Sequence, residues 1–204
     1  MNIGILGGTF DPPHAGHLAA ARCARDGFAL DQVELLPAFQ PPHKPGRPLS
    51  SPFHRYTMTV LATLPEDRVC ASFLELARGG LSYTIDTLRA RAARAGADRI
   101  VFVLGTDQFA EMASWREPRP IVEEFGLIVV TRPGSGFADA LGRLPAWAAD
   151  ARAAGRIREA VMDPVDVSST TIRERIAGGL GTSGLVAPAV SQYIERYGLY
   201  RSGG

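Results

Sequence analysis

The chain has 204 residues, of which 46% are hydrophobic and 21% are charged, and its formal net charge is +1 at pH 7. This composition excludes a disordered or collagen-like chain, and the small net charge excludes a strong overall field toward nucleic acid or an anionic membrane. We therefore expect one compact domain over residues 1–204 that binds small molecules, with no nucleic-acid and no membrane partner.

The cysteines and the apolar segments indicate whether the chain contains disulfides, metal sites or membrane-spanning segments. Cys23 and Cys70 belong to no CxxC pattern and have no neighbouring histidine cluster, so we expect buried free thiols rather than a disulfide or a zinc site. Met1 leads directly into an apolar run, and no apolar stretch reaches membrane-spanning length. We expect a cytoplasmic protein whose side chains form no metal site of their own.

Short apolar runs alternate with longer Ala-rich and Arg-rich segments, which predicts strands alternating with helices. The expected strands are 3–6, 33–36, 69–73, 100–104, 127–131 and 160–162. The expected helices are 14–26, 52–63, 84–95, 139–154, 170–177 and 188–197. Because residues 101–104 and 127–130 are apolar at every position, both faces of those strands should be covered by helices. The predicted fold class is α/β, a doubly wound and mostly parallel sheet, with a helical portion over about 165–200 packed on it. Ligands of such sheets bind outside the carboxyl ends of the strands.

The first strand is followed by the segment GGTFDPPHAGH, which ends at His17. Paired glycines let backbone N–H groups approach a phosphate, and a helix start adds partial positive charge. We expect Asp11 to cap the following helix, and His14 and His17, three residues apart, to project from one face toward the strand end. Neither a Walker A pattern nor GxGxxG occurs, which argues against a P-loop and an ordinary dinucleotide fold.

The segment VSSTTIR, which ends at Arg173, predicts a second strand-to-helix junction. Thr171 and Glu174 have the spacing of a capping box. The hydroxyls of Ser168 and Ser169, the free N–H groups of the helix start and the guanidinium of Arg173 together form a candidate anion site that suits a leaving pyrophosphate.

The two motifs together resemble those of the HxGH nucleotidyltransferase superfamily, and the full wording of the first is similar to bacterial nicotinate-mononucleotide adenylyltransferases. The resemblance implies a Rossmann-like nucleotidyltransferase fold, with His14, His17, Lys44 and Arg173 as the catalytic residues around the ATP phosphates. Lys44 lies in a proline-rich loop, 37–52, where a flexible ammonium can follow migrating charge. Mg²⁺ is expected to arrive with ATP, because this ion keeps several waters and takes few protein ligands. The expected ATP-binding residues are Gly7, Gly8, Thr9, Phe10, His14, His17, Gly105, Asp107, Ser168, Ser169 and Arg173.

Four further residues are expected to bind the second substrate, a pyridine mononucleotide. Tyr83 and Thr84 open a helix whose N–H groups can receive a carboxylate, Trp115 offers a flat apolar face for a pyridine ring, and Arg132 follows the fifth strand as a candidate phosphate ligand. The apolar C-terminal run that includes Tyr200 is expected to serve packing.

The function that the resemblance implies is transfer of AMP from ATP to nicotinate mononucleotide, which yields nicotinate adenine dinucleotide and pyrophosphate in NAD biosynthesis. A different acceptor, such as phosphopantetheine or the amide form of the mononucleotide, is an alternative. Another is a nucleotide-sensing module that transfers nothing, for which Asp26 and Asp31 are the candidate ribose-binding acids. The oligomeric state stays open, a homo-oligomer included.

Overall fold

The computed structural model describes residues 1–42, 49–134 and 136–201. Its strands are β1 (Asn2–Gly8), β2 (Gln32–Pro37), β3 (Val69–Ala71), β4 (Arg99–Gly105), β5 (Leu127–Thr131) and β6 (Ile157–Val161). Its helices are α1 (Ala15–Gly27), α2 (Pro52–Thr63), α3 (Leu74–Arg78), α4 (Thr84–Ala92), α5 (Thr106–Ala110), α6 (Pro118–Phe125), α7 (Phe137–Gly142), α8 (Trp147–Ala153), α9 (Ser169–Ala177) and α10 (Pro188–Tyr197), with a short 3₁₀ turn at Met112–Ser114.

The strands form one sheet in the order β3-β2-β1-β4-β5-β6, and every neighbouring pair is parallel. The chain adds strands outward from β1 to β3 and then crosses back to add β4, β5 and β6 on the other side. The strand order therefore reverses between β1 and β4, and in such sheets the crevice at this reversal point is the usual ligand site. The doubly wound α/β fold class is confirmed.

Helices cover both faces of the sheet, and alternate strand residues divide between two apolar layers. On β4, Val101 and Val103 face one layer, whereas Ile100, Phe102 and Leu104 face the other. The first layer is completed by α1, α2, α9 and α10, and the second by α3 to α8. This two-sided burial explains why the sequence of β4 is apolar at consecutive positions. Among the helices described, none combines the length and the apolarity that crossing a lipid bilayer requires.

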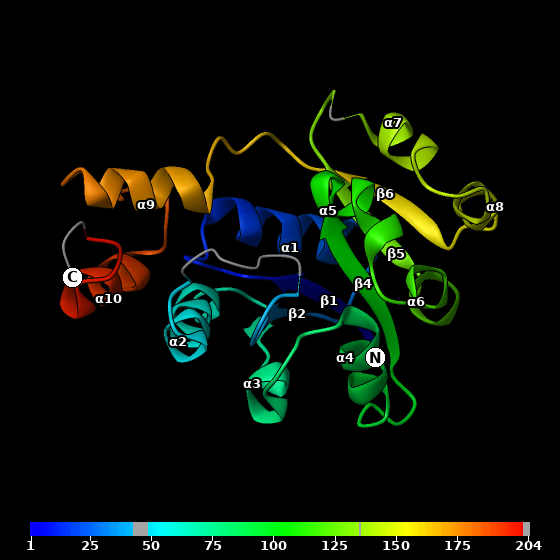
Figure 1. Cartoon of the computed structure of the whole chain (residues 1–204), viewed down its shortest axis with the longest axis horizontal. Helices are drawn as coiled ribbons and strands as arrows, with labels where there is room; N and C mark the ends of the chain where they lie inside the picture. The colour runs from blue at the N-terminus through cyan, green and yellow to red at the C-terminus, as the bar shows by residue number, and fades with distance from the viewer. Residues whose placement is uncertain (43–48, 135, 202–204) are drawn as a thin grey trace.

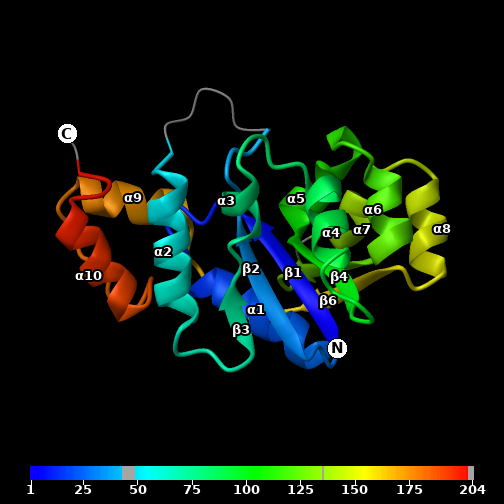
Figure 2. The same cartoon turned by 90° about the horizontal axis from the view of Figure 1, so that it is seen from below.

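The C-terminal helices α9 and α10 lie together beside α2 at one end of the molecule, while α6, α7 and α8 lie at the other (Figures 1 and 2). Ile172 of α9 and Val190 and Ile194 of α10 are buried in the layer that α1 and α2 share. The C-terminal portion is thus attached to the sheet through α1 and α2.

Several elements differ from the sequence-based expectation. The helix predicted over 139–154 is two helices, because α7 ends at Gly142 and Pro145 interrupts the pattern before α8 begins. Helix α6 was not predicted, although Pro118 and Pro120 stand in its first turn, where a missing N–H costs nothing. Strand β6 begins at Ile157, earlier than predicted, and the helix predicted over 84–95 ends at Ala92. Cys23 and Cys70 are free thiols, as expected, but half-buried rather than buried.

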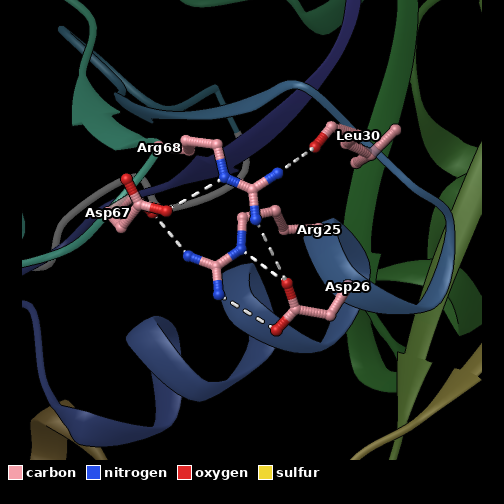
Figure 3. A network of polar contacts seen from close by, with 5 residues as sticks. All are labelled: Arg25, Asp26, Leu30, Asp67 and Arg68. Atoms are coloured by element: carbon pink, nitrogen blue, oxygen red, sulfur yellow. Dashed lines mark hydrogen bonds and ion pairs between the residues drawn. The ribbon is translucent and has the colours of Figure 1, made fainter.

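At the amino end of the sheet, the last turn of α1 is connected to the loop before β3 by a polar network (Figure 3). Arg25 Nε donates to Asp26 Oδ1 at 2.7 Å, and its Nη1 donates to the carbonyl of Asp67. Arg68 Nε donates to Asp67 Oδ2 at 3.0 Å, and its Nη1 reaches the carbonyl of Leu30 at 3.3 Å. These groups satisfy one another at the molecular surface.

Candidate active site

The turn after β1 is shaped by a glycine and a buried aromatic ring. Phe10 has a φ of +50°, which is uncommon for a residue with a side chain, and its ring is only 1% exposed. A Cβ atom at Gly8 would lie 2.8 Å from Cζ of Phe10, so a side chain at position 8 would displace the ring. The turn therefore needs glycine where the backbone passes the Phe10 ring.

The two histidines lie stacked at the start of α1. Their ring centroids are 3.7 Å apart, and the backbone N–H of His14 donates to Nδ1 of His17 at 3.2 Å. That bond places the proton of a neutral His17 ring on Nε2, which is then a donor. A Cβ atom at Gly16 would lie 3.1 Å from the His14 ring, so the glycine of the motif allows His14 its close position.

His14 is buried and chemically unusual. It is 8% exposed, and its buried Nδ1 has no hydrogen-bond partner in the part of the chain that the structure describes. Burial, and secondarily the charge of Arg132, lower the pKa of His14 to about 4. A buried, neutral imidazole with an unused nitrogen is suited to a ligand rather than to packing.

The expected cap at Asp11 is wrong, because α1 begins at Ala15 and His14 occupies the N-cap position. The carboxylate of Asp11 is instead 3% exposed and accepts hydrogen bonds from the hydroxyl of Tyr200 at 2.6 Å and from the backbone N–H of Ser50 at 3.2 Å. Asp11 thus connects the turn to Tyr200 and Ser50 and does not cap the helix.

The second motif lies against the first. Ser169 Oγ donates to the carbonyl of Pro12 at 2.9 Å, and Arg173 Nη1 donates to the carbonyl of Asp11 at 2.6 Å. The capping box expected at Thr171 is wrong: Ser168 is the N-cap of α9, and its Oγ accepts from the backbone N–H of Thr171 at 3.0 Å. The two segments, more than 150 residues apart in the sequence, are thus in direct contact.

Both motifs line one cavity of about 590 Å³, here called the histidine pocket. Gly105 at the end of β4, Asp107 in α5 and Arg132, which follows β5, also line it. Arg173 does not; besides Asp11, its guanidinium contacts Thr170 Oγ1 at 3.1 Å. The sequence-predicted residues that line the histidine pocket are Gly7, Gly8, Thr9, Phe10, His14, His17, Gly105, Asp107, Arg132, Ser168 and Ser169.

A second, smaller cavity of about 180 Å³, here called the tryptophan pocket, is lined by Tyr83, Thr84 and Trp115. The Trp115 ring meets the Phe102 ring edge-on at 6.1 Å, and the guanidinium of Arg116 lies 5.0 Å from the centre of the Tyr83 ring. Residues Gly7 to Thr9 and Gln108 line both cavities. The two pockets therefore meet at the turn after β1, at the point where the strand order reverses.

This arrangement can be compared with known proteins. A family model described as cytidylyltransferase-like matches residues 5–175. A Bordetella petrii protein named "Probable nicotinate-nucleotide adenylyltransferase" is 42% identical over 98% of both chains. A Thermus thermophilus protein of the same name is 38% identical over 98% of this chain and 100% of the relative. The chain belongs to the nicotinate-nucleotide adenylyltransferase family.

A solved structure extends the likeness of this adenylyltransferase to three dimensions. Plasmodium falciparum nicotinic acid mononucleotide adenylyltransferase, complexed with NaAD, superimposes with a TM-score of 0.74 over 98% of this chain and 97% of that chain. The identity of the pair is 19%, so this match supports the fold alone.

Sequence reasoning missed the buried polar residues that hold the loops of the adenylyltransferase around the pockets. Arg55 of α2 is 1% exposed and donates to the carbonyls of Thr9 at 2.8 Å, Phe39 at 3.0 Å and Ser50 at 3.0 Å. The sequence signal was its position on the buried face of α2, three residues before Met58. A long cation on an apolar helix face indicates a structural hydrogen-bonding role.

Three remaining expectations have different outcomes. Lys44 lies outside the described residues. Asp26 and Asp31, the acids of the sensor alternative, lie at the amino end of the sheet, where Asp31 Oδ2 accepts from the N–H of Asn2 and Asp26 pairs with Arg25. A ribose-binding acid belongs at the carboxyl end of the sheet. Asp26 and Asp31 therefore do not support the sensor alternative.

Proposed function

We propose that this adenylyltransferase transfers AMP from ATP to the phosphate of nicotinate mononucleotide, forming nicotinate adenine dinucleotide and pyrophosphate in NAD biosynthesis. The single observation that carries the proposal is the meeting of the two pockets at residues 7–9. Two nucleotides bound in neighbouring pockets would bring an acceptor phosphate and the α-phosphate of ATP together at this turn. Alignment of this kind supplies much of the rate in phosphoryl chemistry.

The histidine pocket is assigned to ATP. An oxygen of the acceptor phosphate attacks the α-phosphorus in line, the new P–O bond forms, and the bond to the bridging oxygen of pyrophosphate breaks. His14 and His17 would donate to phosphate oxygens, together with N–H groups at the start of α1, and no covalent intermediate on the enzyme is needed. Ser168 and Ser169, which line the histidine pocket, would hold the leaving pyrophosphate. Arg173 does not line the pocket, and would reach the phosphates with guanidinium N–H groups left over from its bonds to Asp11 and Thr170, assisted by Lys44.

The residues present fit Mg²⁺ that is bound mainly by the triphosphate. Among the described residues, no group of three or more His, Cys, Asp or Glu side chains is placed to hold a metal ion, and Asp107 is the carboxylate that lines the histidine pocket. Mg²⁺ prefers oxygen ligands and retains waters, so phosphate oxygens, water and at most Asp107 would complete its coordination. When bound, it supplies positive charge to the phosphate oxygens.

The tryptophan pocket is assigned to the pyridine ring of the acceptor. The first N–H groups of α4, near Thr84, have no partner within the helix and can donate to a carboxylate. Glu75 in the same pocket already accepts from Thr87 Oγ1 at 2.8 Å and from the N–H of Phe39 at 3.2 Å. Donors at the helix start favour the acid over the amide. Arg132 would meet the acceptor phosphate where it enters the histidine pocket.

An acceptor panel tests the proposal. Pyrophosphate release from ATP is measured with nicotinate mononucleotide, with its amide counterpart and with phosphopantetheine in turn. We expect kcat/KM for the acid to exceed that for the amide by about 10-fold to 100-fold, the effect of hydrogen bonds to one charged group. Equal values for acid and amide would contradict the assignment of the acid. ATP binding seen by calorimetry with no pyrophosphate from any acceptor would contradict the enzyme itself.

A further inference from the structure

Asp11 connects three segments that are remote in the sequence. Its Oδ1 accepts from the hydroxyl of Tyr200 at 2.6 Å, and its Oδ2 accepts from the N–H of Ser50 at 3.2 Å. Its backbone carbonyl accepts from Nη1 of Arg173 at 2.6 Å. Asp11, three residues before His14, is thereby fixed by the C-terminal segment, by Ser50 in the loop before α2 and by α9.

Tyr200 makes this contact from an unfavourable backbone conformation. Its φ is +65°, a region in which bulky residues are genuine outliers and which persists only when the surroundings enforce it. Burial, followed by the charge of Asp11, raises the pKa of the Tyr200 hydroxyl. The hydroxyl therefore stays protonated at neutral pH and acts as a donor to the carboxylate.

Arg55 strengthens the same connection. The guanidinium donates to the carbonyl of Ser50, the residue whose N–H binds Asp11, and to the carbonyl of Thr9 within the turn. Its charge interacts favourably with the carboxylate of Asp11. Asp11 is thus a buried carboxylate with donors on both oxygens and a cation nearby, which makes its position sharply defined.

We propose that Tyr200 is a positioning residue for adenylyl transfer, whose hydroxyl fixes Asp11, which in turn fixes the guanidinium of Arg173 and the turn that leads to His14. The inference rests on the proposed function, because that function assigns Arg173 to the triphosphate. It assigns to the C-terminal segment a role beyond the packing expected from its sequence.

The change Tyr200→Phe removes only the hydroxyl and leaves the ring in place. Without its donor, Oδ1 of Asp11 is left buried and unsatisfied, so the carboxylate and the carbonyl that holds Arg173 shift. We expect about a tenfold weaker affinity for a non-hydrolysable ATP analogue in calorimetry and about a tenfold higher KM for ATP in turnover. The KM for the acceptor at saturating ATP should stay within about twofold, since the tryptophan pocket is not touched.

The matched control is Tyr197→Phe on the same C-terminal segment. The Tyr197 side chain is 59% exposed and packs against the rings of His54 and Tyr193, away from Asp11. All assays are run at a temperature at which circular dichroism shows each variant folded. Loss of folded enzyme would lower kcat without changing either KM, which would overturn the proposal. An equal rise of the KM for ATP in the Tyr197→Phe control would overturn it as well.

A double-mutant cycle with Arg173→Lys tests the route through Arg173. If Tyr200 acts through this guanidinium, Tyr200→Phe should weaken binding of the ATP analogue by less than about twofold in the Arg173→Lys background. A full tenfold effect in that background would contradict the route. The calorimetric arm needs no turnover: a parent that binds the analogue but releases no pyrophosphate rejects the proposed function, whereas equal affinities of parent and Tyr200→Phe reject the positioning role.

Discussion

At the amino end of the sheet, charged side chains pair with one another at the surface, whereas at the carboxyl end polar side chains are buried around the turn before α1. Asp26, at the amino end, keeps a 59% exposed side chain while it pairs with Arg25. Asp11 and His14, at the carboxyl end, are 3% and 8% exposed. Exposed pairs contribute little to stability, and buried polar groups cost free energy unless each finds a partner.

The difference favours the carboxyl end as the site of the proposed function. Asp11 and Arg55 are fully engaged with protein groups, but Nδ1 of His14 is buried and unpartnered in the described chain. A folded protein tolerates such a group where a ligand or a catalytic role needs it. The carboxyl end thus combines buried polar groups that fix the turn with a buried nitrogen that has no partner in the described chain. In the amino-end network of Figure 3, the charged side chains bind one another.

The largest expected effect in this comparison comes from His17→Ala. Removing one preorganised donor to a phosphate typically lowers the rate by about 100-fold to 1000-fold. His17 is only half-buried and lies in the first turn of α1, so the fold should persist. Pyrophosphate release under saturating substrates measures the loss, and circular dichroism checks the fold. Near-parental turnover in a folded His17→Ala protein would reject the histidine pocket as the site of transfer.

A second effect follows from the titration of His14. Its folded pKa is about 4, while the ordinary value of 6.5 holds in the unfolded chain. The unfolded chain therefore binds more protons between these pH values, and the free energy of unfolding falls as the pH is lowered through this window. By pH 4 this protonation of the unfolded chain lowers the free energy of unfolding by about 3 kcal/mol, and above about pH 7 it has no effect.

The variant His14→Asn separates this contribution from the other titrating groups. Denaturant unfolding of parent and variant is measured at steps between pH 7 and pH 4, and the difference between their pH dependences is compared. We expect the parent to lose up to about 3 kcal/mol more than the variant over this range. Parallel pH dependences would show that His14 keeps an ordinary pKa and is solvated rather than buried.

The sequence predicted the sheet well because its strands are short apolar runs bounded by Gly or Pro, a signal that is local. It also predicted both motifs, since a strand-to-helix junction with glycines and hydroxyls is readable from neighbouring residues. Asp11 was misassigned for the same reason: an Asp before two prolines has the local pattern of a cap, whereas its partner Tyr200 is 189 residues away. Arg55 likewise depends on loops that only the tertiary fold brings together.

The smallest expected effect belongs to the amino end, where Asp26→Asn removes the centre of the network in Figure 3. The hydrogen bond from Arg25 lowers the pKa of Asp26. The stabilisation that the ionised Asp26 gives the folded state is therefore present above the ordinary pKa of the carboxyl group and is lost as the pH falls below that value. Because the pair is exposed and screened, we expect the free energy of unfolding to fall by less than about 1 kcal/mol, and by less still in about 0.5 M salt. Pyrophosphate release should stay within about twofold of the parent. A tenfold loss of turnover would show that the two ends of the sheet are coupled, and the division between a paired amino end and a functional carboxyl end would then fail.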